Sequence, residues 1–568
     1  MNVSNEQDGL MYFAYRLQEA TFHYSIDVYK ASLYNTNQLV REYVHVASIV
    51  ENGELNKSYL ETIKDEFIDA IEHDVVLKKY WGLDNIKLIK QQIGTSNLLD
   101  IEKIMKYLSD IWDKAKYYNW CKEYIKEIVV QKNEKKKIEL AIRCFLPELY
   151  AYGYSNVYIY NVIKNTLLDK SNQNINIFLD TFDCKIKDYD VYLAISRDVL
   201  PFNKILTHNF SIEFDDDGHF KELRKYDEDK YIVIKVKNVK AMDPNTAMVN
   251  AKSILNIFTM FYIAVDNKSK FDIFKTAMIR WDEQKCYATD SDSGFSKIEK
   301  YTNVEAGNVA ENTLNRLTEN FFFNKETMFS LIEVLEKHNS AILDDNVENS
   351  FLNLWSIFEM VTKNIDSGSK IERIRNVVLM ILSNNYFKRI INDLDKNLKN
   401  IIGEKAYKSI LSKSNIDNKT DEYILACIVF MDEYKSLREE FYSLLKNNAN
   451  IRSRISQLND LGGNVKGLYS LIKRYKERVS WHLTRMYRYR NCIVHSGTSE
   501  DNIEFICEHL HSYVDVVIND FIKNLTSDMN LKSIDDVIIH NKLYFQQLEK
   551  TINKDTRINE EIISLLLK

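Results

Sequence analysis

The chain has 568 residues, too many for a single hydrophobic core, so we expect two to four domains. Apolar residues make up 45% and charged residues 28% of it, which argues against intrinsic disorder. Lys and Arg number 76 against 82 Asp and Glu, so a net charge of −6 excludes a global attraction to nucleic acid. An anionic partner therefore has to bind a local basic patch.

The cysteines and the N-terminal segment indicate the compartment. Seven scattered cysteines form no C-x-x-C pair, which argues against a disulfide framework or a zinc site and favours a reducing environment. The start, MNVSNEQDGLMYF, has no basic region followed by an apolar core, so we expect no signal peptide. Since no apolar run approaches the roughly 20 residues of a membrane span, we expect a cytoplasmic protein with no membrane partner.

Residues 1–165 are predicted to be an N-terminal helical region, because apolar residues recur three and four positions apart. Two long helices are predicted, over 11–34 (MYFAYRLQEATFHYSIDVYKASLY) and over 101–130. We assign the many Tyr and Trp side chains here to the core and the half-buried surface.

Residues 166–300 are predicted to form an α+β module with a regulatory or sensing role. Strands are predicted over four short β-branched and aromatic segments, 174–182, 190–196, 208–214 and 231–239, and over the pair 271–281 and 284–290. Between them, Asp243 is predicted to cap a helix of about five turns that starts at Pro244. The stretch FDDDGHF (214–220) lacks the ligand spacing of an EF-hand loop, and we interpret it as a hairpin turn.

From residue 301 the pattern is helical to the end. We predict connecting helices over 301–340, a helical bundle over 341–527 and a helical tail over 528–568, so that the fold class is mainly α with a central α+β module. Predicted helices include 308–323, 325–338, 349–365 and a long charged helix over 421–446; LNDLGG (458–463) predicts a break. Nothing matches a glycine loop that cradles phosphate.

A basic amphipathic helix is predicted from Lys466 to His495, a segment that contains eight Lys and Arg residues but only one Glu. Its buried stripe should consist of Leu468, Ile472, Tyr475, Val479, Leu483, Met486 and Ile493. Phosphate contacts with base stacking would use the remaining faces, and a solvated face balanced by acidic neighbours is the alternative. The residues that we predict to contact RNA are Lys473, Arg474, Arg478, Arg485, Arg488 and Tyr489.

The helix ends in the decapeptide RYRNCIVHSG (488–497), which carries Arg490, Asn491 and His495. Five residues turn an α-helix by about 500°, so Arg490 and His495 are about 140° apart and cannot share one face of a regular helix. Gly497 predicts that the helix ends there. His495 should therefore lie on the last turn or in the following loop, where it can turn toward Arg490 or toward another chain.

The string R-N-C-I-V-H (490–495) is an R-x4-H motif with Asn directly after Arg, followed by Ser-Gly and preceded by a Trp-Glu helix, FLNLWSIFEMVT (351–362). With the basic helix before it and a long helix after it (501–525), it resembles the HEPN superfamily, and most of all the Apea-like HEPN branch of bacterial anti-phage defence proteins. The resemblance covers roughly residues 340–525. It implies that 341–527 is a HEPN helical bundle.

In nuclease-active HEPN proteins this motif implies metal-independent RNA cleavage without a cofactor, and the chemistry suits the residues. A histidine exchanges protons near neutral pH, so His495 can act on the RNA 2′-hydroxyl that attacks its own phosphate. Arg490 can bridge two phosphate oxygens and stabilise the developing charge. Asn491 can orient His495 or hold a phosphate. DNA, which lacks the 2′-hydroxyl, would be spared.

Glu359 is predicted to support this site, as the acidic residue on the helix that the resemblance matches. It follows Trp355 by four positions and Leu352 by seven, so it flanks the buried stripe of its helix. A carboxylate in that position needs a partner, and we expect Arg490 or His495. The alternative is a surface glutamate at the edge of the stripe.

One histidine per motif is too few for concerted acid and base roles. HEPN ribonucleases solve this by pairing two motifs, so the resemblance implies a homodimer through the bundle. We assign structural roles to His482, His509 and His511; His509 and His511, two apart on a helix, make a poor metal pair.

Two functions are open at this point. The first is a toxic ribonuclease effector of phage defence (abortive infection) that cuts tRNA or phage and host transcripts, with residues 1–340 responding to a phage-derived trigger or inhibitor. The second is a non-catalytic HEPN protein that docks RNA, a nucleotide or a protein partner. The intact Arg490, Asn491 and His495 favour the first.

Overall fold

A computed structural model of the protein describes residues 5–22, 25–53, 55–169, 173–214, 229–266, 271–289, 325–344, 346–365, 368–446, 448–463, 465–497, 502–526, 531–552 and 557–568. These residues fall into two compact units, one within Met1–Pro147 and Tyr301–Lys568 and the other within Glu148–Lys300. The expected mainly α chain with a central α+β module is thus found. The helices before residue 147 pack with the C-terminal helices in one unit, whereas we expected a separate N-terminal region.

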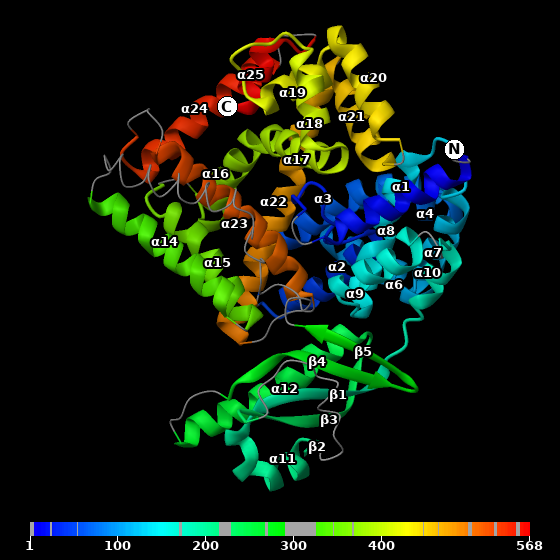
Figure 1. The fold of residues 1–568 in the computed structure, drawn as a ribbon, viewed down its shortest axis with the longest axis vertical. Coiled ribbons are helices and arrows are strands. Elements are labelled where there is room, and N and C mark those ends of the chain that lie inside the picture. The colour runs from blue at the N-terminus through cyan, green and yellow to red at the C-terminus, as the bar shows by residue number, and fades with distance from the viewer. Residues whose placement is uncertain are drawn as a thin grey trace. The chain divides into compact units, whose positions relative to one another are not determined.

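The N-terminal part is helical, as predicted (Figure 1). Its helices are α1 (Asn5–Ala20), α2 (Thr36–Glu51), α3 (Ser58–His73), α4 (Val75–Tyr80), α5 (Leu83–Thr95), α6 (Leu98–Ile111), α7 (Lys114–Ile128) and α8 (Lys135–Tyr152). The helix predicted over 101–130 is in fact two, because Asp113 leaves helical geometry and its carboxylate accepts hydrogen bonds from the first backbone N–H groups of α7.

The helix predicted over 11–34 is wrong beyond Ala20. Residues 25–34 are irregular and carry Asp27 into the core, where its carboxylate has no exposed surface. Arg389 forms an ion pair with Asp27, and the Tyr475 hydroxyl donates a hydrogen bond to it over 2.9 Å. These tertiary contacts hold the segment out of the helix that its apolar periodicity predicts.

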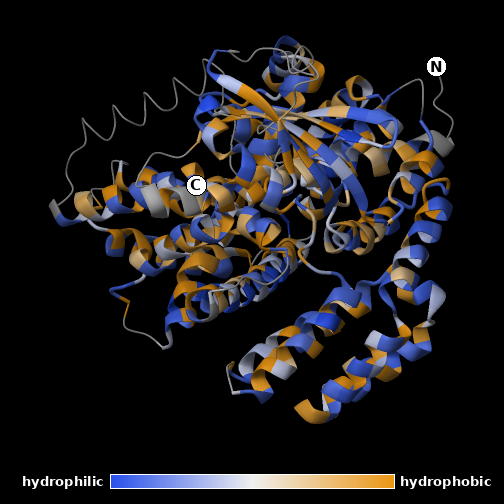
Figure 2. Ribbon diagram, turned by 90° about the horizontal axis from the view of Figure 1, so that it is seen from below, coloured by the Kyte–Doolittle hydropathy of each residue, from blue (hydrophilic) through white to orange (hydrophobic). Residues whose placement is uncertain are grey.

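The C-terminal part of the same unit is also helical. It contains α14 (Lys325–Leu343), α15 (Val347–Val361), α16 (Lys370–Asn384), α17 (Tyr386–Ile402), α18 (Glu404–Ser412), α19 (Asp421–Phe430), the 3₁₀ turn η5 (Asp432–Tyr434), α20 (Lys435–Leu444), α21 (Ala449–Gly462), α22 (Val465–Ser496), α23 (Ile503–Leu525), α24 (Ile534–Ile552) and α25 (Glu560–Leu567). In Figure 2, hydrophobic and hydrophilic segments alternate along the helices, as amphipathic packing requires. The helix predicted over 308–323 lies outside the described residues.

The long helix predicted over 421–446 is broken. Met431 adopts an extended conformation and ends α19, and the buried Arg438 side chain of α20 folds back to donate to the Ile428 carbonyl over 2.6 Å. Every residue of α19 from Tyr423 to Phe430 is buried, because α17, α21 and α25 surround it. A helix that is apolar on all sides belongs in a core and cannot continue as a solvated one.

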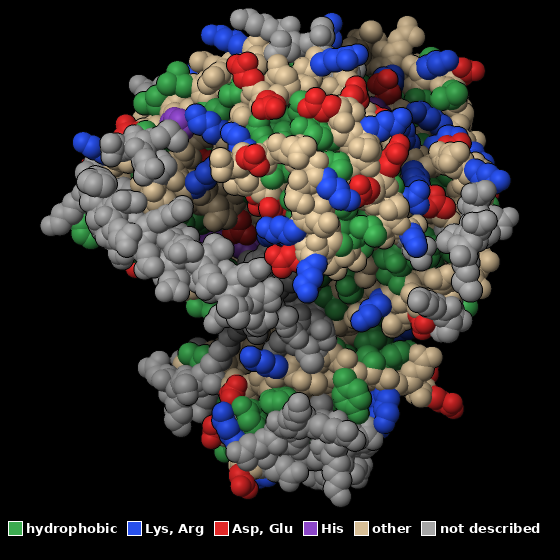
Figure 3. All heavy atoms as spheres, turned by 45° about the horizontal axis from the view of Figure 1, so that its top comes forward, with side chains coloured by type: hydrophobic (Ala, Val, Ile, Leu, Met, Phe, Trp, Pro, Cys, Tyr) green, Lys and Arg blue, Asp and Glu red, His purple; other side chains and the backbone are tan. Residues whose placement is uncertain are grey.

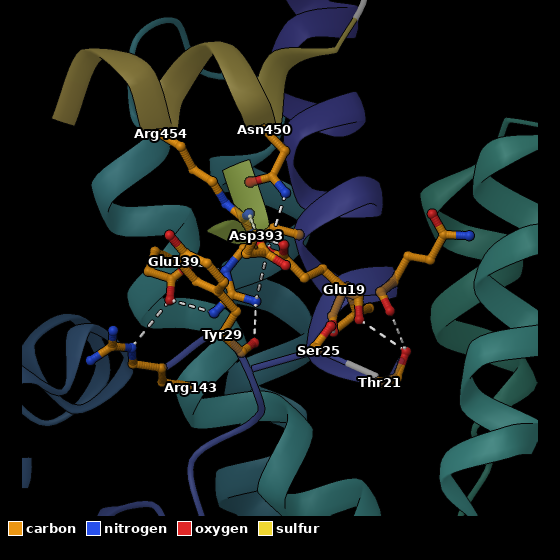
Figure 4. Close-up of polar contacts among 12 residues, drawn as sticks. Glu19, Thr21, Ser25, Tyr29, Glu139, Arg143, Asp393, Asn450 and Arg454 are labelled. Carbon is orange, nitrogen blue, oxygen red and sulfur yellow. Dashed lines mark hydrogen bonds and ion pairs between the residues drawn. The ribbon is translucent and has the colours of Figure 1, made fainter. Parts of the chain in front are cut away.

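Ionic contacts join the two parts of this unit (Figure 4). Arg454 of α21 forms ion pairs with Glu19 of α1 and with Asp393 of α17, the latter over 2.8 Å. Its guanidinium carbon lies 3.5 Å from the centre of the Tyr29 ring. Asn450 donates to Glu19 over 3.2 Å. The first helix of the chain is therefore held by helices about 400 residues further along.

The second unit is an antiparallel sheet packed on a helix. Five strands, β1 (Lys187–Ser196), β2 (Ile212–Phe214), β3 (Tyr231–Ala241), β4 (Ile273–Trp281) and β5 (Gln284–Thr289), pair in the order β2-β3-β1-β4-β5. The helical elements are α9 (Asn156–Ile163), the π-helix η1 (Lys164–Leu168), α10 (Ile175–Thr181), the 3₁₀ helix η2 (Arg197–Phe202), α11 (Asn203–Asn209) and α12 (Pro244–Asp266).

Most of the predictions for this unit are confirmed. Strand alternation buries Val191, Leu193 and Ile195 of β1 against α12, and the predicted cap is present, since the Thr246 amide donates to Asp243 over 2.9 Å. The strand predicted over 174–182 is wrong: Asn174 caps α10, and Phe178 and Phe182 pack four residues apart. Most of FDDDGHF lies outside the described residues.

None of the helices in the described ranges combines the length and the apolar character that crossing a membrane requires.

The break predicted at 458–463 lies only at the end of that segment, since α21 stays helical as far as Gly462 and α22 begins at Val465. The end of α21 generates a test. The carbonyl oxygen of Phe430 approaches α21 so closely that a Cβ on Gly462 would lie 1.8 Å from it, whereas a Cβ on Gly463 would meet nothing within 4 Å. We therefore expect Gly462→Ala to lower the free energy of unfolding by about 2 kcal/mol or more, because backbone has to move. Gly463→Ala, the control, should change it by less than about 0.5 kcal/mol. Urea unfolding followed by circular dichroism measures both; equal effects would contradict the tight contact.

Candidate functional site

The basic helix predicted from Lys466 onward is α22. All seven residues of its predicted apolar stripe are buried, namely Leu468, Ile472, Tyr475, Val479, Leu483, Met486 and Ile493. Figure 1 shows α22 in orange between the blue helix α3 and the C-terminal helices α16 and α23, and α22 packs on α3, α15, α16 and α24. The helix is therefore a central element of the unit, with exposed residues only on part of its surface.

Two arginines of the predicted RNA-contacting set are buried. The Arg485 guanidinium donates to both oxygens of Glu42 over 2.7 and 2.8 Å and also pairs with Glu66, while Arg488 pairs with Glu42 over 2.7 Å. The side chains of Arg485 and Arg488 are 3% and 1% exposed. The prediction of an outward cationic face is wrong for these two, because carboxylates of α2 and α3 draw them inward. Tyr489 is buried as well, with its hydroxyl 3.1 Å from that of Tyr34.

The pKa shifts of this buried cluster follow from burial and charge. Burial favours the protonated form of Glu42, but Arg485 and Arg488 outweigh it and hold the pKa of Glu42 below its ordinary value. Burial likewise opposes the charge on Arg485, and the two carboxylates outweigh it and raise the pKa of Arg485. For Glu66, burial dominates and raises the pKa. Glu42 is thus the ionised centre of the cluster.

The other members of the predicted set remain accessible. Lys473 and Arg474 are exposed, and Arg478 is half-buried, with its guanidinium 3.7 Å from the Asp27 carboxylate. On the face drawn in Figure 3, Lys and Arg side chains are interspersed with Asp and Glu. An anion that binds α22 is therefore expected near residues 473–478.

Arg474 and Arg478 also line a cavity of about 260 Å³. Arg143 of α8 and the aromatic side chains Tyr34 and Trp481 contribute to its wall. Three acidic residues, Glu66, Asp69 and Asp74, line it as well. The combination of guanidinium groups and aromatic rings suits a small anionic ligand with a planar part.

The C-terminal end of α22 brings Arg490 and Glu359 together, as predicted. Arg490 Nε lies 3.3 Å from Glu359 Oε1, and both side chains are only about one fifth exposed, at 23% and 20%. Arg490 Nη1 donates to the Asn491 amide oxygen over 3.4 Å. Glu359 is therefore an ion-pair partner that orients a half-buried arginine, and the alternative of a simple surface glutamate is wrong.

Three contacts around this pair were missed from the sequence. Trp355 Nε1 donates to Glu359 over 3.0 Å, and Lys370 Nζ lies 2.8 Å from the other Glu359 oxygen. Tyr59 of α3 lies near Asn491; burial raises the pKa of Tyr59 to about 12, and the neighbouring Asn491 side chain opposes the shift. Trp355 lies one turn before Glu359 on α15, so the four-residue spacing in the sequence could have predicted this contact. Tyr59 lies more than 400 residues away, and no local signal points to it.

His495 lies on the last turn of α22 and is exposed. The helix ends as predicted: Gly497 has a φ of +67°, and its N–H donates to the Ile493 carbonyl over 3.1 Å. Val494 beside His495 is 48% exposed. Within the described part of the chain, no contact joins His495 to Arg490. The structure thus assembles Arg490, Asn491 and Glu359 and leaves His495 at the surface.

The neighbouring histidines have different environments. His482 Nδ1 lies 2.7 Å from the Tyr513 hydroxyl, and burial lowers the pKa of His482 well below its ordinary range. Burial also lowers the pKa of His509 to about 3. His511 points to another side of α23, toward His338 of α14. His509 and His511 therefore share no site.

No protein-family model matches the chain, and neither curated proteins nor solved structures yield a significant match.

The buried cluster generates a stability test. Glu42→Gln keeps the volume of the side chain but removes the carboxylate charge that pairs with Arg485 and Arg488. We expect it to lower the free energy of unfolding by about 3 kcal/mol or more, as for a broken buried ion pair. The control is Glu440→Gln, which removes the exposed pair of Glu440 with Lys413, 40% and 51% exposed, and should cost less than about 1 kcal/mol. Similar denaturation midpoints for both variants would contradict the role of Glu42.

Proposed function

We propose that the protein is a metal-independent endoribonuclease of the HEPN type, a toxic effector in anti-phage defence. The observation that supports it best is the end of α22, where Glu359 and Asn491 orient the Arg490 guanidinium while His495 is exposed on the following turn. A fixed cation beside an accessible proton carrier is what phosphate cleavage without a metal needs.

The proposed reaction uses these residues in turn. One His495 takes the proton of an RNA 2′-hydroxyl, whose oxygen then attacks the adjacent phosphorus. The bond to the 5′-oxygen breaks, and a second histidine donates a proton to that leaving oxygen. Arg490 stabilises the charge on the phosphate oxygens. The products are a 2′,3′-cyclic phosphate and a 5′-hydroxyl.

A homodimer supplies the second histidine. His495 and the apolar Val494 are both exposed at the end of a rigid helix, so a second copy can approach this end and bring its own His495. RNA would reach the paired motifs along the exposed Lys473 and Arg474 and the half-buried Arg478. The buried Arg485 and Arg488 hold α22 in place through their ion pairs with Glu42 and Glu66. The unit within Glu148–Lys300 is assigned the sensing role.

Substitutions at the motif test this proposal. We expect His495→Ala and Arg490→Ala to abolish toxicity or phage protection in a bacterial host. In vitro, each should slow RNA cleavage by roughly 10²-fold or more, as the loss of an acid–base group or of a charge-stabilising donor does in other enzymes. Arg490→Lys, which keeps the charge but loses the planar fork, should also be impaired. His45→Ala, at an exposed histidine of α2, is the control and should behave as wild type.

Three results would contradict the ribonuclease. Toxicity that survives His495→Ala would remove the proposed acid–base group. A strict requirement for Mg²⁺, with no cleavage in EDTA, would indicate a different chemistry. A strictly monomeric protein at micromolar concentration in light scattering would exclude facing motifs.

The second function that we consider is a non-catalytic bundle that docks a small anion or nucleotide, and the cavity at Arg474 and Arg478 favours it. It predicts that AMP raises the thermal unfolding midpoint of the wild type, and that Arg474→Ala abolishes this shift. His495→Ala should leave the shift unchanged. If neither AMP nor inorganic phosphate shifts the unfolding midpoint, this second function is contradicted.

A further inference from the structure

A second cluster of reactive side chains lies on α14 and α23. His511 and Asp515 are four residues apart on α23 and therefore share one face, and His338 of α14 meets them from a segment 173 residues earlier. His338 Nε2 lies 2.9 Å from Asp515 Oδ1 and 3.2 Å from His511 Nε2, and His511 Nε2 lies 3.5 Å from the same Asp515 oxygen. Three donor atoms thus form a small triangle.

Protons alone satisfy this triangle poorly. An imidazole nitrogen either donates or accepts. If only His338 Nε2 carries a proton, the lone pairs of His511 and Asp515 face each other. If both Nε2 atoms carry protons, two N–H groups face each other across 3.2 Å. As long as Asp515 is ionised, every arrangement leaves one side of the triangle with like groups opposed, whereas a cation in front of the three atoms would accept a lone pair from each.

We propose that His338 Nε2, His511 Nε2 and Asp515 Oδ1 bind a divalent transition-metal ion, with Zn²⁺ the best fit. Zinc bonds to imidazole nitrogen and carboxylate oxygen of about 2.0–2.1 Å in a tetrahedron place neighbouring donor atoms about 3.3–3.4 Å apart. The three observed separations lie around that value. Two imidazoles and one carboxylate select zinc and its neighbours in the first transition row over Mg²⁺ or Ca²⁺.

The surroundings enclose the cluster only in part, since His338, His511 and Asp515 are each half-buried. Lys30 and Glu508 also face the cluster and form a pair with each other over 4.0 Å. Since Asp515 is 39% exposed, a water molecule has access to the fourth position.

The bound ion would fasten α14 to α23. Both helices pack against α15, the helix that carries Glu359. Metal binding would therefore stiffen the layer that positions Arg490, as a structural clip away from the cleavage residues. This inference does not rest on the proposed ribonuclease activity, and its test measures binding and stability.

The test uses the full chain, stripped of metal by chelation and dialysis. We expect one Zn²⁺ per chain, a thermal unfolding midpoint that rises by several degrees with Zn²⁺ but not with Mg²⁺, and a visible absorption band of low-symmetry Co²⁺ on substitution. His511→Ala and Asp515→Asn should weaken Zn²⁺ binding by about tenfold or more. Asp515→Asn also keeps the shape of the cluster, so that it reports on ligation if His511→Ala folds poorly.

His45→Ala, which removes an exposed histidine outside the cluster, should retain the zinc shift and the Co²⁺ band. The absence of stoichiometric Zn²⁺ binding by the wild type would overturn the proposal. Equal Zn²⁺ affinity of the wild type, His511→Ala and Asp515→Asn would overturn it as well, since the metal would then bind elsewhere.

Discussion

A buried guanidinium group needs acceptors for its N–H groups, and the two carboxylates that supply them to Arg485 and Arg488 set the position of α22. Arg485 and Arg488 point into the N-terminal helices because Glu42 and Glu66 meet them there. Once these two residues face inward, the rotation of about 100° per residue fixes the directions of the following side chains of α22. Arg490 lies about 200° further round and faces α15. His495, seven residues after Arg488, follows the same side of the helix but extends past the cluster and reaches solvent.

The end of α22 therefore combines a fixed half and an accessible half. Glu359, with Trp355 and Lys370 around it, holds one side of Arg490, and Tyr59 of another helix lies near Asn491. These supports come from α3, α15 and α16, so the orientation of Arg490 depends on the packing of the whole helical unit. A functional group on such a rigid element is held more closely than one on a loop. His495 and Val494, by contrast, are exposed.

The same packing links the end of α22 to the histidine–aspartate cluster. α15 lies beside both α14 and α23, and these three helices form the layer that supplies Glu359. Contacts between α14 and α23 at His338, His511 and Asp515 therefore act on the element that orients Arg490. The cavity at Arg474 and Arg478 lies at the opposite, N-terminal half of α22. The cavity and the Arg490 site thus lie on α22 itself, and the histidine–aspartate cluster lies on helices that pack against α15, a neighbour of α22.

Local patterns in the sequence were enough to predict most elements and part of the site. Short β-branched and aromatic segments predicted β1, β3, β4 and β5, and the apolar stripe predicted the buried face of α22, because these signals are local to each element. The same reasoning failed where apolar periodicity continues across a break. Residues 11–34 and 421–446 were expected as single helices, although the buried Asp27 and Arg438 interrupt them.

The sequence by itself determined that a basic helix ends in Arg490, Asn491, His495 and a terminating Gly497, and that a carboxylate at Glu359 needs a cationic partner. Only the tertiary structure decided which of the basic residues face solvent. Glu42 lies on the apolar side of its own helix, between Leu39 and Val46, which marks it for burial but not for a particular arginine. Its partners lie 443 residues further along the chain or beyond. Charge pairs across such separations leave no local pattern, because they arise only when folding brings the helices together.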